Sequence, residues 1–358
     1  MPVTNSRQRL AEPPIRVQTL ESFDFGAPDY RGLFARSDAT AFQHPVWLDI
    51  FYRVLAPALD ARPAVVVGHE ADGRLALVLP LALRRKSGVT LLEAADLGVS
   101  DYAAPILAPD LAVDEALREA VAAALPAHDL LRIGKVRDQH LAAWQALLGT
   151  AGEAADYGAH AAQHGADYSA WRAATLDAGF LRNLDRKARR FFKLPGAVVR
   201  TIDKADERAA AVEAIRRDRA GRFPGDPIQS DAVFAFYRDL AVSGGDFVRI
   251  YALEAQGERI GHTLCVADRG RLHYLLIGCD YDRHGRLSPG YILYEAMMKD
   301  WAESGGTVFD FTIGDEPFKA DFGTRRTQMH QFSRANGWLG KLARTALDAR
   351  KQRAGRGT

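Results

Sequence analysis

Between Phe247 and Gly323 the sequence reads as three strands, a glycine-containing loop, a helix and a fourth strand, in unbroken order. Apolar and β-branched runs mark the strands, and the helical spacing between them stops at a pair of glycines. A helix that follows a strand in this way can place its N-terminus beside the edge of an open sheet. The segment therefore predicts a mixed sheet flanked by helices, with a place suited to a phosphate-bearing ligand.

The loop before this helix has the composition of an anion site. Ser288 is a suitable N-cap, Pro289 fits the first turn, and Gly290 allows a ligand to approach the backbone. Arg283 and Arg286 add positive charge beside the free N–H groups of the helix terminus. The alternative reading is an ordinary capped helix with two solvated arginines.

Three other side chains in this segment have the chemistry of a site. Asp310 lies in the middle of the strand VFDFTI, where it is either paired in the core or faces a cleft as a base. His262 lies inside a strand, where a satisfied core histidine is the simpler interpretation. Lys319 follows the last sheet strand and is either a surface lysine or a charge for a ligand.

Length and composition indicate two domains of a protein with substantial cores. The chain has 358 residues, 47% of them apolar, and its net charge of +2 is too balanced to indicate nucleic acid as a partner. Cys265 and Cys279 both lie in predicted strands, so we expect free thiols. The longest apolar run, Leu75–Leu83, is too short for a bilayer. We therefore expect a cytoplasmic protein, either free or peripheral at the inner membrane.

Alternating strands and helices divide the chain into four parts. We expect a flexible tail over residues 1–14, a first domain over 15–165, a second over 166–335, and a basic C-terminal helix and tail over 336–358. Basic side chains are also concentrated on a predicted helix near residue 190. The basic face of such a helix is either exposed to solvent or suited to binding anionic lipid. The basic residues of that helix are Arg182, Arg186, Lys187, Arg189, Arg190 and Lys193.

Several phrases together carry a family resemblance. SPGYILYEAMMKDWAESGG, FDFTIGDEPFK, RNLDRKARRFFKLPG and the earlier DLGVSDYAAPIL resemble the CelD/BcsL, BioF2-like branch of the GNAT acyltransferases, and they are similar to the FemAB/FemX group. The resemblance covers roughly residues 40–335. It implies an α/β fold of tandem GNAT-like domains, each a mixed, mostly antiparallel sheet flanked by helices. No P-loop, Rossmann, zincin or CxxC motif accompanies it.

The resemblance also implies a reaction, in which an amine attacks the thioester of an acyl-CoA. The acyl-CoA is then a co-substrate lying along the strand that ends at Cys279, with its pyrophosphate near Gly290, and no permanently bound cofactor or metal is expected. We expect Asp310 or His262 as the base, with Asp280 close by at the strand end. Phosphate or substrate charge would be bound by Arg283, Arg286 and Lys319, together with the loop residues Ser288 and Gly290.

The acceptor that this family suggests is an amine of a lipid or cell-envelope precursor, including a sphingoid base as in bacterial ceramide synthases. Three alternatives stay open. They are an acetyltransferase for exopolysaccharide or cellulose biosynthesis, a FemX-like aminoacyl-tRNA-dependent transferase, and a non-catalytic envelope-assembly adaptor on a GNAT fold. The sequence does not indicate the oligomeric state.

Overall fold

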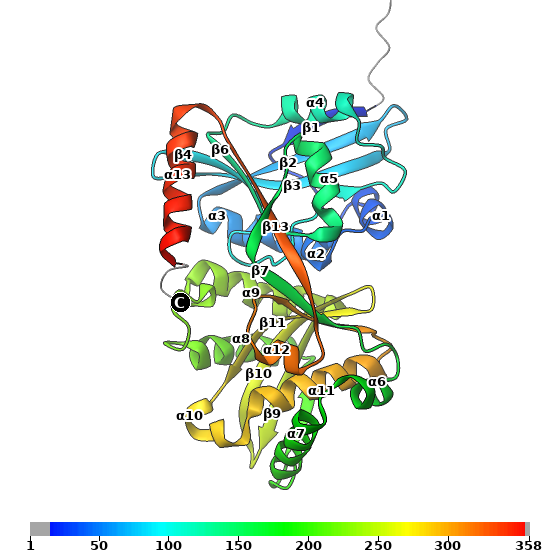
Figure 1. Ribbon diagram of the computed structural model, residues 1–358, viewed down its shortest axis with the longest axis vertical. Coiled ribbons are helices and arrows are strands. Elements are labelled where there is room, and N and C mark those ends of the chain that lie inside the picture. Colours follow the sequence, from blue (N-terminus) through cyan, green and yellow to red (C-terminus); the bar gives the residue numbers. More distant parts are fainter. Residues whose placement is uncertain (1–14, 355–358) are drawn as a thin grey trace, which may run out of the picture.

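The structure is a computed structural model that describes residues 15–354, and the side chains of 15–347. The tail predicted over residues 1–14 and the basic side chains beyond residue 347 lie outside this part of the chain. A single sheet of 13 strands runs through both halves of the molecule, with helices on its two faces (Figure 1). Its strand order is β1-β2-β3-β4-β6-β13-β7-β12-β11-β10-β9-β8, with β5 paired to β3.

The first half begins with a strand and two helical segments, followed by three antiparallel strands. These elements are β1 (Ile15–Leu20), α1 (Pro28–Arg36), α2 (Pro45–Ile50) with the π-helix Phe51–Leu55 and α3 (Ala56–Ala58), β2 (Ala61–Glu70), β3 (Leu75–Lys86) and β4 (Val89–Ala94). The half continues with β5 (Ile106–Leu107), α4 (Glu115–Ala124), β6 (Leu130–Arg137), α5 (Asp138–Leu148) and β7 (Glu153–Ala162).

The second half repeats this order after two linking helices, α6 (Tyr168–Thr175) and α7 (Ala178–Phe191). It contains β8 (Val198–Thr201), α8 (Ala205–Arg219), α9 (Asp231–Ser243), β9 (Val248–Ala255), β10 (Glu258–Asp268) and β11 (Arg271–Cys279). Then follow α10 (Tyr281–His284), α11 (Pro289–Glu303), β12 (Val308–Ile313), α12 (Phe318–Asp321), β13 (Arg325–Ala335) and the terminal α13 (Gly337–Ala354). The expected fold class, two tandem mixed α/β units, is confirmed.

Each half contains one parallel strand pair joined by a crossover helix. In the first half β4 and β6 are parallel and α4 connects them, and in the second half β11 and β12 are parallel and α11 connects them. A parallel pair requires such a crossover because its strands start at the same edge of the sheet. All other pairings in the sheet are antiparallel.

The two halves exchange their last strands. β7 pairs with β12 of the second half, whereas β13 returns to pair with β6 of the first half. β7 and β13 also pair with each other over six residue pairs, and they lie together where the two halves meet (Figure 1). The proposed division at residue 165 therefore cuts a sheet that is continuous in space, and each half depends on a strand from the other.

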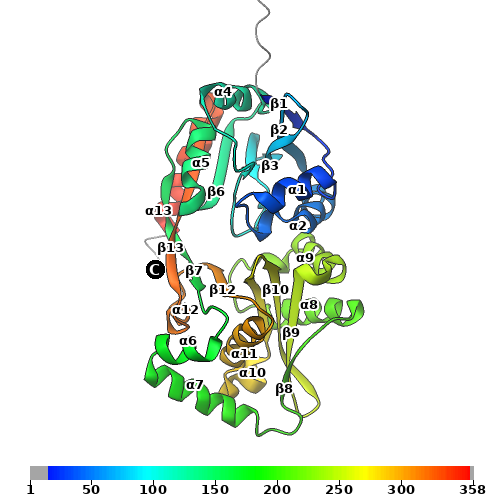
Figure 2. The ribbon, with the colours of Figure 1, turned by 90° about the vertical axis from the view of Figure 1, so that its right-hand side faces the viewer.

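The faces of the β10–β11 hairpin explain how the second half packs. The Oγ1 atom of Thr263 donates to the Met297 sulfur of α11 at 3.1 Å, so one face meets α11. On the other face the Gly278 backbone lies so close to α8 that an added Cβ would be 2.6 Å from the Ile215 Cα. Leu293, Met297 and Trp301, which share one face of α11, are all buried. α11 and α8 therefore enclose this hairpin between them (Figure 2).

Candidate functional site

A cleft opens where β11 and β12 separate. The two strands pair only through Arg271–His273 and Val308–Asp310, and then they diverge. Thr312 has φ +58°, an uncommon backbone conformation for a β-branched residue, at the place where β12 turns away. The cleft has a volume of about 610 Å³ and lies between these strands, the end of α8, the start of α11 and α12.

Strand β11 contains a β-bulge beside this cleft. The pairing with β10 shifts register between Leu276 and Tyr274, which leaves Leu275 as an extra residue on β11. Leu275 also lines the cleft. The extra residue of a β-bulge is not paired in the ladder, and bulges frequently redirect groups toward a site. The backbone at Leu275 is thus placed to interact with a ligand between the two strands.

Aromatic side chains form much of the cleft wall. The Tyr294 hydroxyl donates to the Tyr274 hydroxyl at 3.1 Å, and Phe318 stacks on Tyr294 with ring centroids 5.3 Å apart. Burial raises the pKa of Tyr274 and the pKa of Tyr294 well above the ordinary tyrosine value. Both hydroxyls therefore stay protonated at neutral pH and can donate a hydrogen bond or a proton.

A carboxylate from the first half completes the cleft. Asp101 lies in the loop between β4 and β5, is partly exposed, and lines the cleft together with second-half residues. Burial raises the pKa of Asp101 to about 6, although Lys135 and a hydrogen bond from the Thr312 hydroxyl act to lower it. A group with this pKa is ionised at neutral pH and still basic enough to accept a proton. Asp101 therefore has both the place and the acidity of a general base.

Asp310 is fully buried and has polar partners in the core. This is the first of the two alternatives predicted for it, and the second was a base that faces a cleft. Its carboxylate accepts hydrogen bonds from the Tyr102 hydroxyl (2.8 Å), Arg271 Nη1 (3.0 Å) and the Thr312 backbone N–H (2.8 Å). Burial alone would raise the pKa of Asp310, but His273 and Arg271 outweigh it and lower that pKa below its ordinary value. Asp310 is not among the residues that line the cleft. It joins the two halves, and its low basicity does not suit the predicted role as the base.

His262 lies outside the cleft as well. It is 3% exposed on β10, and neither ring nitrogen has a hydrogen-bond partner among the described residues. Burial, with a smaller contribution from Arg259, lowers the pKa of His262 to about 4, so the ring is neutral at pH 7. Asp280 is the N-cap of α10, where its Oδ1 accepts the Arg283 backbone N–H at 3.1 Å. Neither residue is positioned in the cleft as the resemblance led us to expect.

The N-terminus of α11 borders the cleft, but not with the predicted cap. Ser288 occupies the N-cap position in a left-handed conformation (φ +56°), and its side chain makes no capping hydrogen bond. Gly290 lines the cleft, and a Cβ at this position would lie 2.7 Å from the Tyr281 hydroxyl. A larger residue here would therefore require the Tyr281 side chain to move from the first turn.

The predicted cations are mostly engaged elsewhere. Arg283 is exposed and holds both oxygens of Glu258, at 2.8 and 3.0 Å. Lys319 lines the cleft, but its Nζ donates to the carbonyls of Ile313 (2.7 Å) and Gly314 (3.0 Å). Arg286 is exposed on the turn just before α11. Of the three, only Arg286 is available for a ligand at this terminus.

Two arginines that the sequence did not single out line the cleft, and each is paired with a carboxylate. Arg219 and Arg222, at the end of α8, both line it. Arg219 holds Asp226 through two hydrogen bonds (2.8 and 3.0 Å) and also donates to the Ile277 carbonyl of β11 at 3.2 Å. Arg222 donates to Asp282 at 2.7 Å. Nothing in the local sequence marks these residues, because only the packing of α8 on β11 brings them to the cleft.

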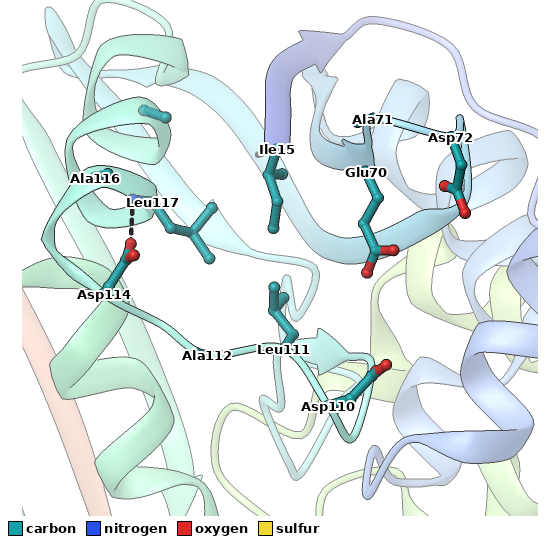
Figure 3. Close-up of a pocket in the computed structure, with 11 residues that line it drawn as sticks. Ile15, Glu70, Ala71, Asp72, Asp110, Leu111, Ala112, Asp114, Ala116 and Leu117 are labelled. Carbon is teal, nitrogen blue, oxygen red and sulfur yellow. Dashed lines mark hydrogen bonds between the residues drawn. The ribbon is translucent and has the colours of Figure 1, made fainter. Parts of the chain in front are cut away.

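The corresponding helix of the first half is α4, and carboxylates lie at its N-terminus. A pocket of about 600 Å³ lies at the N-terminus of α4 and is rimmed by carboxylates, as Figure 3 shows. Asp114 caps α4 by accepting the Leu117 backbone N–H at 2.9 Å, and Glu70, Asp72 and Asp110 lie around the same pocket. A helix terminus already satisfied by its own carboxylate does not attract a phosphate.

The described part of the chain contains neither a metal-binding cluster nor a membrane-spanning helix. Across residues 15–354 no group of three or more histidine, cysteine, aspartate or glutamate side chains could hold a metal ion. Within the same part of the chain, no helix is both long enough and apolar enough to cross a bilayer. Cys265 and Cys279 are buried free thiols, as expected.

Comparison with known proteins supports the fold of the second half directly. A family described as "Acetyltransferase (GNAT) domain" matches residues 178–320, which contain β11, α11 and β12. No curated protein matches the sequence.

Solved structures resemble almost the whole chain at low sequence identity. FemX has a TM-score of 0.59 at 11% identity, covering 87% of this chain and 96% of FemX. The C-terminal domain of an Agrobacterium fabrum protein described as a lysylphosphatidylglycerol synthetase has a TM-score of 0.53 at 13% identity, covering 90% and 94%. A tandem GNAT protein from the clavulanic acid biosynthesis pathway has a TM-score of 0.52 at 14% identity, covering 90% and 99%. The chain therefore has a tandem GNAT-like fold, and its residues 178–320 are similar to the GNAT acetyltransferase family.

Proposed function

We propose that this protein is an N-acyltransferase that moves an acyl group from a CoA thioester to the amine of a lipid or cell-envelope precursor. The observation that carries the proposal is the cleft between the diverging strands β11 and β12, with Asp101 inside it. The cleft belongs to the part of the chain that matches the GNAT acetyltransferase family. Its lining combines a proton acceptor, protonated tyrosines and a backbone irregularity, which are the groups that acyl transfer requires.

The reaction would begin with attack of the amine nitrogen on the thioester carbonyl carbon. The nitrogen becomes more acidic as its bond to carbon forms, and the Asp101 carboxylate accepts its proton. The carbonyl oxygen gains negative charge, which a backbone N–H on the edge of β11 that is not paired with β12 would stabilise. The carbon–sulfur bond then breaks, a tyrosine hydroxyl in the cleft, such as Tyr274, supplies a proton to the thiolate, and the tyrosine regains a proton as Asp101 releases the one that it accepted. The products are an amide and free CoA.

The remainder of the thioester would follow the edge of β11 toward α11. Beyond His273 this edge is not paired with β12, so its backbone groups can bind the amides of an extended ligand. The pyrophosphate would lie near Gly290 at the N-terminus of α11, where the exposed Arg286 adds positive charge. The carboxylate-rimmed terminus of α4 supports assignment of the thioester to the second half alone.

A FemX-like aminoacyl-tRNA-dependent transferase is the second candidate. The observation that favours it is the exposed basic face of α7, whose only acidic residue, Asp185, is held by Arg172 at 2.5 Å. The basic side chains exposed on this face and just beyond it are Arg182, Arg186, Arg189, Arg190 and Lys193. The same face would also suit the anionic headgroups of a membrane in which a lipid acceptor resides.

The test is release of free thiol from a panel of acyl-CoAs of increasing chain length, in the presence of amines that include a sphingoid base and an amino sugar. We expect thiol release that requires an amine, with equimolar amide detected by mass spectrometry. CoA binding in calorimetry should be retained when RNA is absent. Salt-sensitive RNA binding together with no thiol release from any acyl-CoA would overturn the proposal in favour of the tRNA-dependent transferase.

A further inference from the structure

In each half two parallel strands pair over a short length and then separate, which leaves a gap between them. In the first half β4 and β6 pair only through Leu91–Glu93 and Leu130–Arg132, which repeats the short pairing of β11 with β12. Soon after this pairing, the second strand of each pair contains a non-glycine residue with φ +58°, Lys135 in β6 and Thr312 in β12. Such a conformation is uncommon and costs free energy, so its recurrence at corresponding places indicates a shared local geometry.

In the first half this gap is filled by the chain itself. Residues 95–104, here named the plug segment, leave β4 and lie between β3 and β6. The Ala95 N–H donates to the Pro80 carbonyl at 2.9 Å, and the Ala103 N–H donates to the Lys135 carbonyl at 3.0 Å. The remaining void is about 10 Å³, compared with about 610 Å³ in the cleft of the second half. The plug segment thus occupies the position that the thioester would take in the other half.

The side chain of Lys135 holds the plug segment in place. Its Nζ donates to Asp96 Oδ1 at 2.9 Å and to the Ser100 carbonyl at 2.7 Å. The Ser100 hydroxyl in turn accepts from Trp47 Nε1 at 3.0 Å and donates to the Ala95 carbonyl at 2.8 Å. These contacts fix the backbone immediately before Asp101.

The end of the plug segment reaches the second half at two points. Asp101 lines the cleft between β11 and β12, and the next residue, Tyr102, donates from its hydroxyl to Asp310 at 2.8 Å. The Tyr102 carbonyl accepts from Gln43 Nε2 at 2.9 Å, so both sides of this residue are anchored. Asp101 therefore projects from a rigid segment whose other end is held by Lys135.

We propose that Lys135 is a positioning residue for the cleft of the second half, because it clamps the plug segment in the first-half gap and thereby sets the place and the charge environment of Asp101. This inference rests on the proposed function, in which Asp101 is the base. It goes further in two respects. It assigns a role to a residue of the first half that does not line the cleft, and it limits each chain to one bound thioester.

The charges around Asp101 make the inference testable. Lys135 from β6 and Lys319 from α12 lower the pKa of Asp101, whereas Asp96 from the plug segment raises it. Tyr157 of β7 and Tyr237 of α9 also face this region, and burial raises the pKa of each, so both stay neutral. Loss of the Lys135 charge should therefore raise the pKa of Asp101, and loss of the Asp96 charge should lower it. Both changes break the same ion pair.

The experiment compares wild type with Lys135→Met and Asp96→Asn by ¹³C NMR titration of protein labelled at the aspartate carboxyl carbons. The Asp101 signal is assigned by its absence from the spectrum of Asp101→Asn. We expect a wild-type midpoint near the pKa of about 6, a higher midpoint in Lys135→Met and a lower one in Asp96→Asn. In thiol release, the acidic limb of the kcat profile should move in the same two directions, and kcat of Lys135→Met at pH 6 should fall about ten-fold with KM for acyl-CoA unchanged.

A purely structural role for the ion pair predicts shifts in the same direction in both variants, and that result would overturn the inference. Unchanged midpoints in both variants, or two CoA molecules bound per chain in calorimetry, would also overturn it. The NMR titration and the binding stoichiometry do not require turnover. Absence of thiol release in wild type would therefore reject the proposed function by itself, while these two measurements still decide the role of Lys135.

Discussion

Two aspartates near the junction of the halves show how environment assigns different roles to one residue type. Asp310 is enclosed and surrounded by Tyr102, Arg271 and His273, so its charge is stabilised and its pKa is lowered. Asp101 is partly exposed to a cleft, and burial raises its pKa to about 6. Desolvation dominates where few partners stabilise the charge, and partners dominate where they surround it. Asp310 accordingly joins the two halves, and Asp101 is the group able to accept a proton.

The buried His262 offers a test at the same scale. Both ring nitrogens lack partners among residues 15–347, so His262→Leu should leave stability at pH 7 unchanged or increase it. The pKa of His262 is lowered to about 4, so the unfolded chain binds more protons than the folded one between this value and about 6.5. Folding stability contributed by the neutral ring is therefore lost as pH falls through this range.

Thermal unfolding of wild type and His262→Leu at pH 5 and pH 7 checks this. We expect the variant to gain stability on the order of 1 kcal/mol at pH 5 relative to wild type. Thiol release at pH 7 should be unaffected. Loss of turnover with intact folding would instead restore His262 as the catalytic base.

At the scale of elements, the sequence predicts the regular parts well and the contacts between distant parts poorly. The run from β9 to β12 was predicted because its apolar periodicity and its Ser288–Gly290 loop are local signals. β7 was not recognised, since its sequence EAADYGAHAA is rich in alanine and glycine and becomes a strand only between β12 and β13. Asp101 was missed for a related reason. Its loop belongs to the first half, whereas the other residues that line the cleft belong to the second half.

Close packing of α8 on β11 leads to a second prediction. A Cβ added at Gly278 would lie 2.6 Å from the Ile215 Cα and 3.0 Å from its carbonyl oxygen, which are backbone atoms that cannot move aside. Gly278→Ala should therefore destabilise the protein by about 1–3 kcal/mol. Gly134→Ala is the matched control, because no atom lies within 4 Å of its added Cβ. Chemical denaturation measures both, and equal stability of the two variants would contradict the assigned packing.

For the whole molecule, the exchange of β7 and β13 makes the two halves mutually dependent. β13 leaves the second half to lie between β6 and β7, and β7 provides the neighbour of β12. If the chain were cut after residue 165, each fragment would have strands whose neighbours in the sheet belong to the other fragment. Such unpaired strand edges promote aggregation. The division into residues 15–165 and 166–335 is thus a description along the sequence, and we propose that folding is cooperative across it.

Expression of residues 1–165 and 166–358, separately and together, tests this dependence. We expect each fragment alone to be insoluble or to lack a cooperative unfolding transition, and we expect the tagged first fragment to co-purify with the second when both are expressed. Cooperative unfolding of either fragment alone would show that the exchanged strands are dispensable. Full-length protein expressed in parallel is the control.

In the mechanism that we propose, Asp101, provided by the first half, removes the amine proton in the cleft of the second half. The most direct measurement is amine-dependent thiol release by Asp101→Asn, alongside its CoA affinity and its unfolding temperature. We expect a rate lowered by about 100-fold or more, with CoA affinity and stability retained, because only the proton acceptor is lost. Thiol release by Asp101→Asn at the wild-type rate would contradict it.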